Sequence, residues 1–522
     1  MASRSEIMPI SDANAHVEAM RPTLSRAMLI DPSWQPTVAV NKPQGETLLL
    51  PERAVQFGTG AFLRGFIEYF LDEANRQQLF NGRVVLVGST ESGRDRAFAA
   101  QDGLFTLQCV GAREEDAELR IVASVSRAIS AKTAWQDVLS VARQPEISLV
   151  FSNTTEAGFA LDEADIELSN APQSFPAKLT AFLYERARAF NFDCSRGVVV
   201  LPCELLDNNG DALKSLVRTL ATRWQLPFAF TEWLDDCVPF CNTLVDRIVP
   251  GAPPEPERAR LVAALGYADD LLTVAEPYRL FVIEADTATR ARLPFVDADR
   301  GIIVADNIRA YRERKVRLLN GTHTAMAAVG LLAGVATVDE TMRDSGLALF
   351  ARELLLGAIA PKVTAPDARA FGEDVLMRFA NPHVYHRLAD IANQGTLKLR
   401  VRLLPIVQRY TLASQPIPRS LIVAIAAQFV LMHPQSAHAM VARGEALPTD
   451  DLGAHVRRHW DIAPQAFDGV ARILADSTIW KEDLSRVPGL AAQVGAVAAV
   501  MLTEGVRAAL QGEIPEAQEV SV

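Results

Sequence analysis

The sequence predicts an α/β fold: a doubly wound parallel sheet followed by a mainly α-helical second domain. In the first half of the chain, short apolar runs that suit buried strands alternate with polar or helix-like segments. In the second half, the composition becomes rich in Ala and Leu, with a helical periodicity that prolines interrupt. A chain of 522 residues is also too long for one hydrophobic core, and its length suggests about two to four domains.

The two ends of the chain are expected to lie outside these domains. Residues 1–45 contain five prolines and little periodicity, so we expect a loosely structured N-terminal arm. The first residues are polar and mixed in charge, without the apolar core of a secretory signal. The last stretch, 511–522, is acidic and is expected to form a frayed tail.

Residues 46–280 are expected to form a Rossmann-like, dinucleotide-binding domain. An apolar run at 54–57 leads into a Gly-x-Gly turn, and phenylalanines at helical spacing predict a helix over 62–79. Further runs typical of strands lie at 84–87, 121–125, 147–151 and 197–201. Strands that alternate with helices in this way are typical of a parallel sheet.

The glycine turn favours a dinucleotide site, although the pattern is incomplete. Gly58 permits a tight turn, and Gly60 permits a pyrophosphate to approach backbone amides at the start of a helix. The usual third glycine is expected at position 63, but Leu63 stands there and the next glycine is Gly65. A Gly-x-Gly pair alone is also typical of an ordinary turn.

The choice between NAD and NADP stays open. The acidic residue that usually holds the adenosine ribose is missing from its place after the second strand. Glu91 can serve with some displacement, whereas Arg94 and Arg96 can instead hold the 2′-phosphate of NADP.

Residues 281–510 are expected to form the helical domain, and a polar cluster lies just inside it. Lys315, Asn320 and His323 stand close together in an apolar segment, and buried polar groups are costly unless hydrogen-bonded. Transfer of a hydride to a ketone needs a proton donor and groups that polarise the carbonyl. Lys315 can move the proton, while Asn320 and His323 can donate hydrogen bonds. The alternative is a surface lysine, a capping asparagine and a satisfied core histidine.

Five motifs, in order along the chain, resemble the mannitol dehydrogenase family of long-chain polyol and sugar-acid dehydrogenases. They are GTGAFLRG at 58–65, NTTEAGF at 153–159, PCELLDNNG at 202–210, NTLVDRIVP at 242–250 and the pattern Lys315-x4-Asn320-x2-His323. The resemblance implies a nicotinamide-dependent dehydrogenase with Lys315, Asn320 and His323 as catalytic residues. This chemistry requires no metal ion, and the remaining histidines do not suggest one.

Within the family, the chain resembles the enzymes of sugar acids more than the mannitol dehydrogenases. The resemblance lies in QDGLFTL at 101–107, TVDETM at 337–342, the stretch 378–392 and KLRVRLLP at 398–405. At 203–205 the chain has Cys-Glu-Leu where mannitol dehydrogenases carry Cys-Asp-Asn, so the role of that asparagine does not transfer to Leu205.

The resemblance also implies binding residues. The cofactor is expected at the glycine turn and after the strand at 147–151, on Phe57, Gly58, Thr59, Gly60, Ala61, Phe62, Asn153, Thr154 and Glu156. The substrate is expected to contact Asp246. The local alternatives are an Asx turn and helix cap at 153–156, and a buried ion pair between Asp246 and Arg247.

The segment 397–403 suggests where a substrate carboxylate would bind. In an extended chain, Lys398, Arg400 and Arg402 share one face, and the aliphatic residues between them share the other. Arginine grips carboxylates with two hydrogen bonds, so we expect one of the three, first of all Arg400, to hold the acid group. The alternative is a half-buried segment whose charged face is solvated.

Composition limits the partners. The net charge of −11 argues against nucleic acid or an anionic membrane, because both need a basic face. Five cysteines without a CxxC pair favour a reducing compartment over a disulfide framework. The longest uncharged runs, 324–338 and 490–503, are shorter than the roughly 18 residues of a membrane helix. We therefore expect a cytoplasmic protein with a small-molecule substrate.

The leading functional hypothesis is an NAD(P)-dependent reductase that interconverts a keto sugar acid and its aldonate. The same chemistry on another keto acid or on a neutral polyol is the first alternative. An alternative of a different class is a protein that holds NAD without net redox turnover, such as an epimerase or a sensor.

Overall fold

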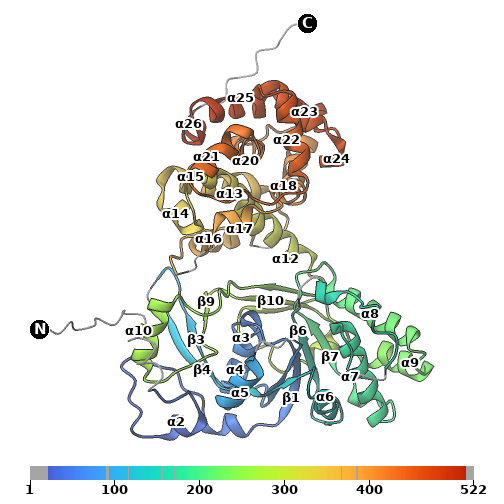
Figure 1. Ribbon diagram of the computed structural model, residues 1–522. Helices are drawn as coiled ribbons and strands as arrows, with labels where there is room; N and C mark the ends of the chain where they lie inside the picture. Colours follow the sequence, from blue (N-terminus) through green and yellow to red (C-terminus); the bar gives the residue numbers. More distant parts are fainter. Residues whose placement is uncertain are drawn as a thin grey trace, which may run out of the picture. The chain divides into compact units, whose positions relative to one another are not determined.

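The computed structural model describes residues 21–89, 93–113, 115, 117–154, 157–168, 171–365, 367–383 and 386–512 (Figure 1). The chain divides into two compact units, Met1–Ile308 and Arg309–Val522. The division falls later than the expected boundary at 280, because β10 (Leu280–Glu284) and β11 (Ile302–Ala305) pair in one sheet with β8 (Thr243–Asp246). These two strands keep the chain in the first unit as far as Ile308.

The first unit is built on a five-stranded sheet in the order β5-β2-β1-β6-β7, in which every pair of neighbours is parallel. The strands are β1 (Glu52–Phe57), β2 (Arg83–Gly88), β5 (Val125–Ser130), β6 (Leu149–Ser152) and β7 (Val199–Pro202). Strand order reverses between β1 and β6, because the chain builds outward on one side of β1 and then returns to its other side. The predicted parallel sheet of Rossmann type is confirmed.

Both faces of this sheet are covered, which is the physical meaning of a doubly wound fold. Along β2, Val84 and Leu86 belong to one hydrophobic core, while Val85 and Val87 belong to another. One core includes α4 and the sheet of β8, β10 and β11. The other includes α6 to α9, of which α7 touches α6, α8 and α9 (Figure 1). The helices of this unit are α2 (Arg26–Ile30), α3 (Ala61–Arg64), α4 (Ile67–Arg76), α5 (Arg94–Ala100), α6 (Trp135–Ala142), α7 (Phe175–Ala189), α8 (Asn209–Arg223), α9 (Phe228–Cys237), α10 (Glu255–Leu265) and α11 (Thr287–Arg290).

The strand expected over 121–125 is divided between two sheets. Its first part ends β4 (Glu118–Val122), which pairs with β3 (Phe105–Cys109), and β3 pairs in turn with β9 (Thr273–Ala275). Its last residue begins β5. Two hydrogen bonds to α4 stabilise the break between β4 and β5. The backbone amide of Ala123 donates to Asp72 Oδ1 (3.0 Å), and Ser124 Oγ donates to the carbonyl of Glu68 (2.9 Å).

The described part of the N-terminal arm is packed, contrary to the expectation of a loose segment. Leu24 and Trp34 are buried in a third core with Tyr267, and Trp34 Nε1 donates to the carbonyl of Leu265 (2.8 Å). Farther along, Asn41 forms a β-bridge with Arg120 of β4. Prolines limit the regular structure of this segment, but its large apolar side chains still find a core.

The structure contains a disulfide between Cys194 and Cys237, so the expectation of a chain without disulfides is wrong. The 3-10 turn Cys194–Arg196 meets the end of α9, where the two Cα atoms are 5.0 Å apart. The two cysteines are 43 residues apart, and a spacing without a motif does not reveal such a contact. Cys109, Cys203 and Cys241 are free and buried.

The second unit is helical in its described residues, as predicted, and α13, α20 and α25 carry much of its buried apolar surface. Its helices are α12 (Arg309–Arg314), α13 (Thr322–Leu332), α14 (Val338–Arg343), α15 (Ser345–Arg352), α16 (Ala368–Phe379), α17 (Leu388–Ala392), α18 (Gly395–Arg402), α19 (Leu404–Leu412), α20 (Arg419–Leu431), α21 (Pro434–Ala442), α22 (Gly453–Ile462), α23 (Ala466–Ala475), α24 (Ser477–Trp480), α25 (Leu490–Thr503) and α26 (Val506–Gln511). Two π-helical segments occur, at Lys315–Gly321 and Glu353–Ile359.

Within the described ranges, no helix alone has the length and apolar character of a membrane span. The pair α20 and α21 meets both criteria only when taken together, and the two helices are bent by 72°.

Candidate active site

The glycine turn follows β1 and has a conformation that favours glycine. Phe57 is buried at the end of the strand, and the next residue, Gly58, has a φ of 122°. The backbone amide of Gly58 donates to the carbonyl of Val87 on β2 (3.0 Å), which ties the turn to the sheet. A Cβ on Gly58 would lie 3.0 Å from the carbonyl oxygen of Asn153. Any other residue here would therefore be strained in both backbone and contact.

The rest of the turn leaves open space beside a short helix. A Cβ on Gly60 would meet no atom within 4 Å, so the backbone here is accessible to a ligand. Thr59 is buried, and its carbonyl accepts a hydrogen bond from Arg64 Nη1 (2.9 Å). Ala61 and Phe62 begin α3, whose N-cap is Gly60.

The helix expected over 62–79 is broken into α3 and α4 at Gly65 and Phe66. A Cβ on Gly65 would lie 2.9 Å from Cγ1 of Val249, so a side chain would not fit there. Arg247 Nη1 also donates to the carbonyl of Gly65 (2.6 Å). Close packing at the third glycine is thus provided two positions later than in the usual pattern.

Asn153 and Thr154 lie beside this turn, at the carboxyl end of β6. Asn153 Nδ2 donates to the carbonyl of Cys203 (2.7 Å), and the amide of Thr154 donates to Glu204 Oε1 (3.0 Å). Ser152 Oγ donates to the other carboxyl oxygen of Glu204 (3.1 Å). Glu204 thus connects the ends of β6 and β7.

The structure therefore brings the glycine turn and Asn153 together where strand order reverses. In open parallel sheets, ligands bind outside the carboxyl ends of the strands at this switch point. Glu91 and Glu156, which were candidates for contacts to the cofactor, lie outside the described residues. Arg94 and Arg96, the candidates for a 2′-phosphate, are exposed on α5.

Two carboxyl groups buried near the turn have raised pKa values. Gln56 Nε2 donates to Glu68 Oε1 (2.6 Å) and to the carbonyl of Gly58 (3.0 Å), so Glu68 lies directly behind the turn. Burial raises the pKa of Glu68 to about 8. Burial also raises the pKa of Glu204 to about 7, against the opposing effect of its hydrogen bonds.

In the second unit, Lys315 and Asn320 lie in a π-helical segment rather than in an α-helix. In an α-helix, two residues five apart differ by about 140° around the axis, at roughly 100° per residue. A π-helix joins residues i and i+5 by hydrogen bonds, so they lie on nearly the same side. The segment thus brings Lys315 and Asn320 to one face, and both are half-buried.

His323 follows in the first turn of α13 and is 7% exposed. Its ring stacks on Phe379 (4.3 Å between centroids) and meets the ring of His386 edge to face (5.0 Å). Its Nε2 is buried without a hydrogen-bond partner among the described residues. Burial first, then the positive charges of His386, Arg378, Arg402 and Lys315, hold the pKa of His323 well below its usual value. The ring is therefore neutral.

The segment 397–403 was expected to be extended, but it lies largely in the helix α18. Leu399 is buried in this helix, and helical packing replaces the alternation of a strand. Arg400 Nη1 donates to the carbonyl of Ile479, toward α24 (2.5 Å). Arg402 Nη1 instead donates to the carbonyl of Asn320 (3.2 Å) and to Thr324 Oγ1 (3.1 Å). Of the two arginines, Arg402 is the one bonded to the segment that carries Asn320.

Asp246 is buried at the end of β8 in the first unit, opposite Leu280 of β10. Its neighbour Arg247 donates to the carbonyl of Glu276 (2.8 Å) and to that of Gly65, and it lies over the ring of Tyr69. Arg247 thus secures the break between α3 and α4.

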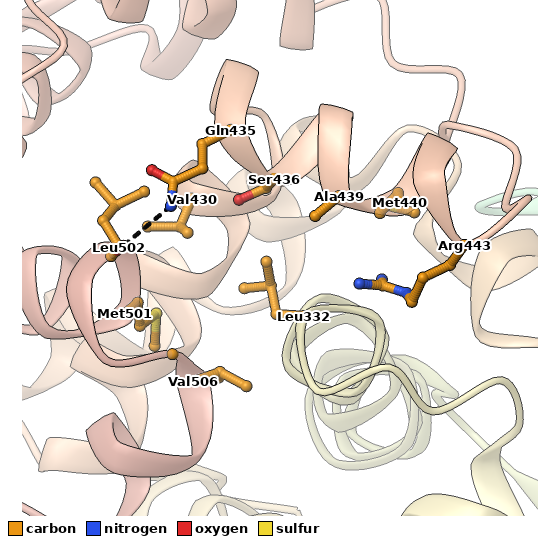
Figure 2. A pocket seen from close by; sticks show the side chains of 11 residues that line it. Leu332, Val430, Gln435, Ser436, Ala439, Met440, Arg443, Met501, Leu502 and Val506 are labelled. Carbon is orange, nitrogen blue, oxygen red and sulfur yellow. Dashed lines mark hydrogen bonds between the residues drawn. The ribbon is translucent and has the colours of Figure 1, made fainter.

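A small cavity of about 140 Å³ in the helical unit is lined by none of the candidate catalytic residues (Figure 2). It lies among α20, α21, α25 and α26, and Gln435 Nε2 closes one side by donating to the carbonyl of Leu502 (3.2 Å). Ligand sites typically enclose about 300–1,000 Å³, so this space is a packing gap rather than a sugar site. Within the described ranges, no group of three or more His, Cys, Asp or Glu side chains has the arrangement of a metal site.

Sequence reasoning did not assign a role to Glu204 or give precedence to Arg402. An acid directly after an apolar strand, in PCELL, is a signal for Glu204. A helical reading of 398–402 would have paired Lys398 with Arg402 at i, i+4 and set Arg400 apart.

Two family models match the chain. The model described as the mannitol dehydrogenase Rossmann domain matches residues 52–295, and the one described as the mannitol dehydrogenase C-terminal domain matches residues 307–501. Among curated relatives, an altronate oxidoreductase of Yersinia pestis is 38% identical over 474 residues, which cover 88% of this chain and 96% of the relative. An altronate oxidoreductase of Shigella flexneri matches with the same identity and coverage.

Two solved structures have a similar fold. The ternary complex of Pseudomonas fluorescens mannitol 2-dehydrogenase with NAD and D-mannitol superposes with a TM-score of 0.68, at 21% identity, covering 94% of this chain and 98% of that one. A D-sorbitol dehydrogenase in substrate-free form superposes with a TM-score of 0.77, at 21% identity, covering 94% and 100%.

Proposed function

The chain belongs to the mannitol dehydrogenase family, and we propose that it is an NAD-dependent reductase that interconverts tagaturonate and altronate. The observation that carries the proposal is the 38% identity to altronate oxidoreductases over 88% of the chain. The positive side chains around His323 support an acidic substrate, because they favour binding of a carboxylate. We place this activity in the cytoplasm, where the nicotinamide cofactor and the sugar-acid substrate would be available.

The residues of the first unit suit a dinucleotide. Gly58 gives the tight turn, the space at Gly60 gives access to the backbone, and both lie at the switch point of a parallel sheet. We assign Phe57, Thr59, Ala61, Phe62, Asn153, Thr154 and Glu156 to the same cofactor site. NADP is the alternative, supported by Arg94 and Arg96 after β2.

The residues of the second unit suit the reduction of a ketone. When bound, a reduced nicotinamide supplies the hydride that the carbonyl carbon takes up. The electron pair of the C=O double bond then moves to oxygen, and this oxygen takes a proton from Lys315 Nζ. Asn320 would donate an amide N–H to the same oxygen, and neutral His323 would offer a ring nitrogen to the substrate. Asp246 would accept hydrogen bonds from substrate hydroxyls.

Other substrates are the main alternatives. The similarity to mannitol and sorbitol dehydrogenases favours a neutral polyol as the second candidate, and fructuronate is a third. A protein that holds NAD without net turnover would keep Gly58 and Gly60 but would not need Lys315, Asn320 and His323 together.

The test is a spectrophotometric assay of the purified enzyme. Oxidation of NADH and NADPH is followed with tagaturonate, fructuronate, tagatose and fructose in turn. We expect the highest kcat/KM with tagaturonate and NADH. A higher kcat/KM with either neutral ketose would overturn the acidic substrate, and no oxidation with any member of the panel would overturn the proposed reaction.

A further inference from the structure

We propose that Arg402 binds the carboxylate of the substrate and thereby makes the enzyme selective for a keto sugar acid over the matching neutral ketose. This inference rests on the proposed function and adds to it the residue that determines selectivity. It replaces the expectation that Arg400 holds the acid group.

The first observation is that α18 buries Leu399 but does not otherwise separate its aliphatic residues from its cations in the usual amphipathic way. Its two cations at i, i+4, Lys398 and Arg402, are half-buried. Leu397 and Val401, which precede each of them by one position, are 36% and 47% exposed. A helix that serves only packing buries its aliphatic side chains and leaves its cations in water. Here the fold directs positive charge toward the protein interior.

The second observation is that Arg402 has no acidic partner among the described residues. Its hydrogen bonds run from Nη1 to the carbonyl of Asn320 and to Thr324 Oγ1, both neutral acceptors. Burial alone lowers the pKa of Arg402 to about 10, so the guanidinium remains charged at neutral pH. The remaining N–H groups of this fork can receive a carboxylate.

The third observation is the concentration of positive charge on neighbouring elements. Lys398 donates to the carbonyl of Ile391 (2.9 Å), and its pKa is lowered first by burial and then by Arg402. Like charges at i, i+4 destabilise a helix unless an anion compensates them. Arg378 of α16 and Lys315 add to the positive side chains that act on His323.

The nearby acids do not compensate Arg402. Asp450 acts on Lys398, but its two oxygens accept the backbone amides of Thr396 and Gly453. Asp390 acts on His386. The electrostatic effects on Arg402 include neither acid, and its pKa is shifted by burial alone.

Geometry separates Arg402 from Arg400. Arg402 is bonded to the carbonyl of Asn320, the residue proposed to hold the reacting oxygen, whereas Arg400 is bonded to Ile479. In tagaturonate, the ketone and the carboxylate lie near opposite ends of the carbon chain. A substrate whose ketone contacts Asn320 therefore needs a cation on an element beside the segment Lys315–Gly321, and α18, which carries Arg402, packs against that segment.

The test compares two variants on two substrates. Arg402→Met and Arg400→Met are assayed with tagaturonate and with tagatose, the neutral ketose of the same carbon skeleton. We expect Arg402→Met to raise the KM for tagaturonate by about tenfold to a hundredfold, the usual effect of losing hydrogen bonds to a charged group. The KM for tagatose should change by less than about threefold. Inhibition constants of altronate and of its neutral alditol give the same comparison without turnover.

The outcomes separate this inference from the proposed function. If wild-type enzyme prefers tagatose, the proposed function fails. If wild type prefers tagaturonate but Arg402→Met loses equally on both substrates, Arg402 only supports Asn320 and the inference fails. A selective loss in Arg400→Met instead would also overturn it. Arg402→Lys, which keeps the charge but not the fork, should show a smaller selective loss, and it keeps the test valid if the Met variant does not fold.

Discussion

The glycine-turn end of the first unit and the His323 region of the second both bury ionisable side chains, but of opposite kinds. Behind the turn and beside it, burial raises the pKa values of Glu68 and Glu204 to about 8 and 7. Around His323, burial lowers the pKa of this histidine and of Arg402. The same physical cause thus favours the protonated form of acids in one region, most strongly of Glu68, and gives a neutral histidine beside cations in the other.

This difference suits two different ligands. A protonated Glu68 carries no charge, so it does not repel an anionic pyrophosphate held at the turn in front of it. In the second region the arginine remains charged, because its lowered pKa is still far above neutrality. The first region therefore avoids negative charge, and the second concentrates positive charge. Both are suited to anions, by backbone groups in one case and by side chains in the other.

The largest effect is expected from Lys315→Ala, which removes the proposed proton donor and changes the second region only. Turnover should fall by about 10²–10⁴, the usual contribution of a positioned acid–base group. The dissociation constant of NADH, measured by fluorescence titration, should change by less than about twofold. Lys362→Ala is the control, because this half-buried lysine of the same unit is bonded to Gln415 and lies over the ring of Tyr410. If the Lys315→Ala enzyme kept an activity within a few-fold of wild type, Lys315 would not be the proton donor.

A smaller effect is expected from Gly58→Ala, which strains the first region only. The φ of 122° and the 3.0 Å approach to the carbonyl of Asn153 should cost about 1–3 kcal/mol. We expect a lower melting temperature and a weakening of NADH binding by about tenfold. Gly60→Ala is the matched variant: it meets no atom within 4 Å, so it should weaken NADH binding without lowering the melting temperature. Unchanged NADH affinity in both variants would exclude this turn as the cofactor site.

The pH dependence of stability sharpens the comparison further. A carboxyl group whose pKa is raised in the folded state, from 4.5 to about 8 for Glu68, holds its proton while the unfolded chain loses it. Its contribution to stability is present below pH 4.5 and is lost as pH rises to about 8, by up to about 1.4 kcal/mol per pH unit. The lowered pKa of His323 affects stability only below about pH 6.5. There the unfolded chain binds a proton that the folded protein does not, so stability falls as pH falls.

Glu68→Gln mimics the protonated carboxyl group and cannot ionise. It should therefore remove the contribution of Glu68 to the pH dependence of stability. Melting temperatures of wild type and variant are compared between pH 5.5 and pH 8, and the decline should be shallower in the variant. Parallel curves would mean that Glu68 is already ionised in the folded protein.

The smallest effect on activity is expected from Cys194→Ser. The disulfide precedes β7, at the amino end of the sheet, whereas both candidate cofactor segments lie at the carboxyl ends of strands. kcat and KM should stay within about twofold of wild type, while the melting temperature falls by several degrees, since a disulfide typically contributes about 2–4 kcal/mol. A large loss of activity would show that the amino end of the sheet also controls the site.

Local patterns predicted the parallel sheet, the turn at Gly58 and the grouping of Lys315, Asn320 and His323. What they missed depends on contacts between distant segments. The π-helical segment adds one residue to a helical turn, and hydrophobic spacing does not show this. The helix α18 was expected to be extended because Lys398, Arg400 and Arg402 alternate with aliphatic residues, but their partners lie at Ile391, Ile479 and Asn320. Only the tertiary fold shows which of these cations is bonded to the segment that carries Asn320.

The packed N-terminal segment has a consequence for how the protein behaves with other copies of itself. In the sheet β4-β3-β9, β4 is an edge strand, and such edges can pair with other chains and seed aggregation. Here the amide of Asn41 donates to Leu119 (2.8 Å) and its carbonyl accepts from Ile121 (3.0 Å), so part of that edge is already occupied. The family model begins only at residue 52. An expression clone trimmed to that boundary would uncover both this edge and the apolar surface beneath Trp34, and its solubility would suffer before its chemistry did.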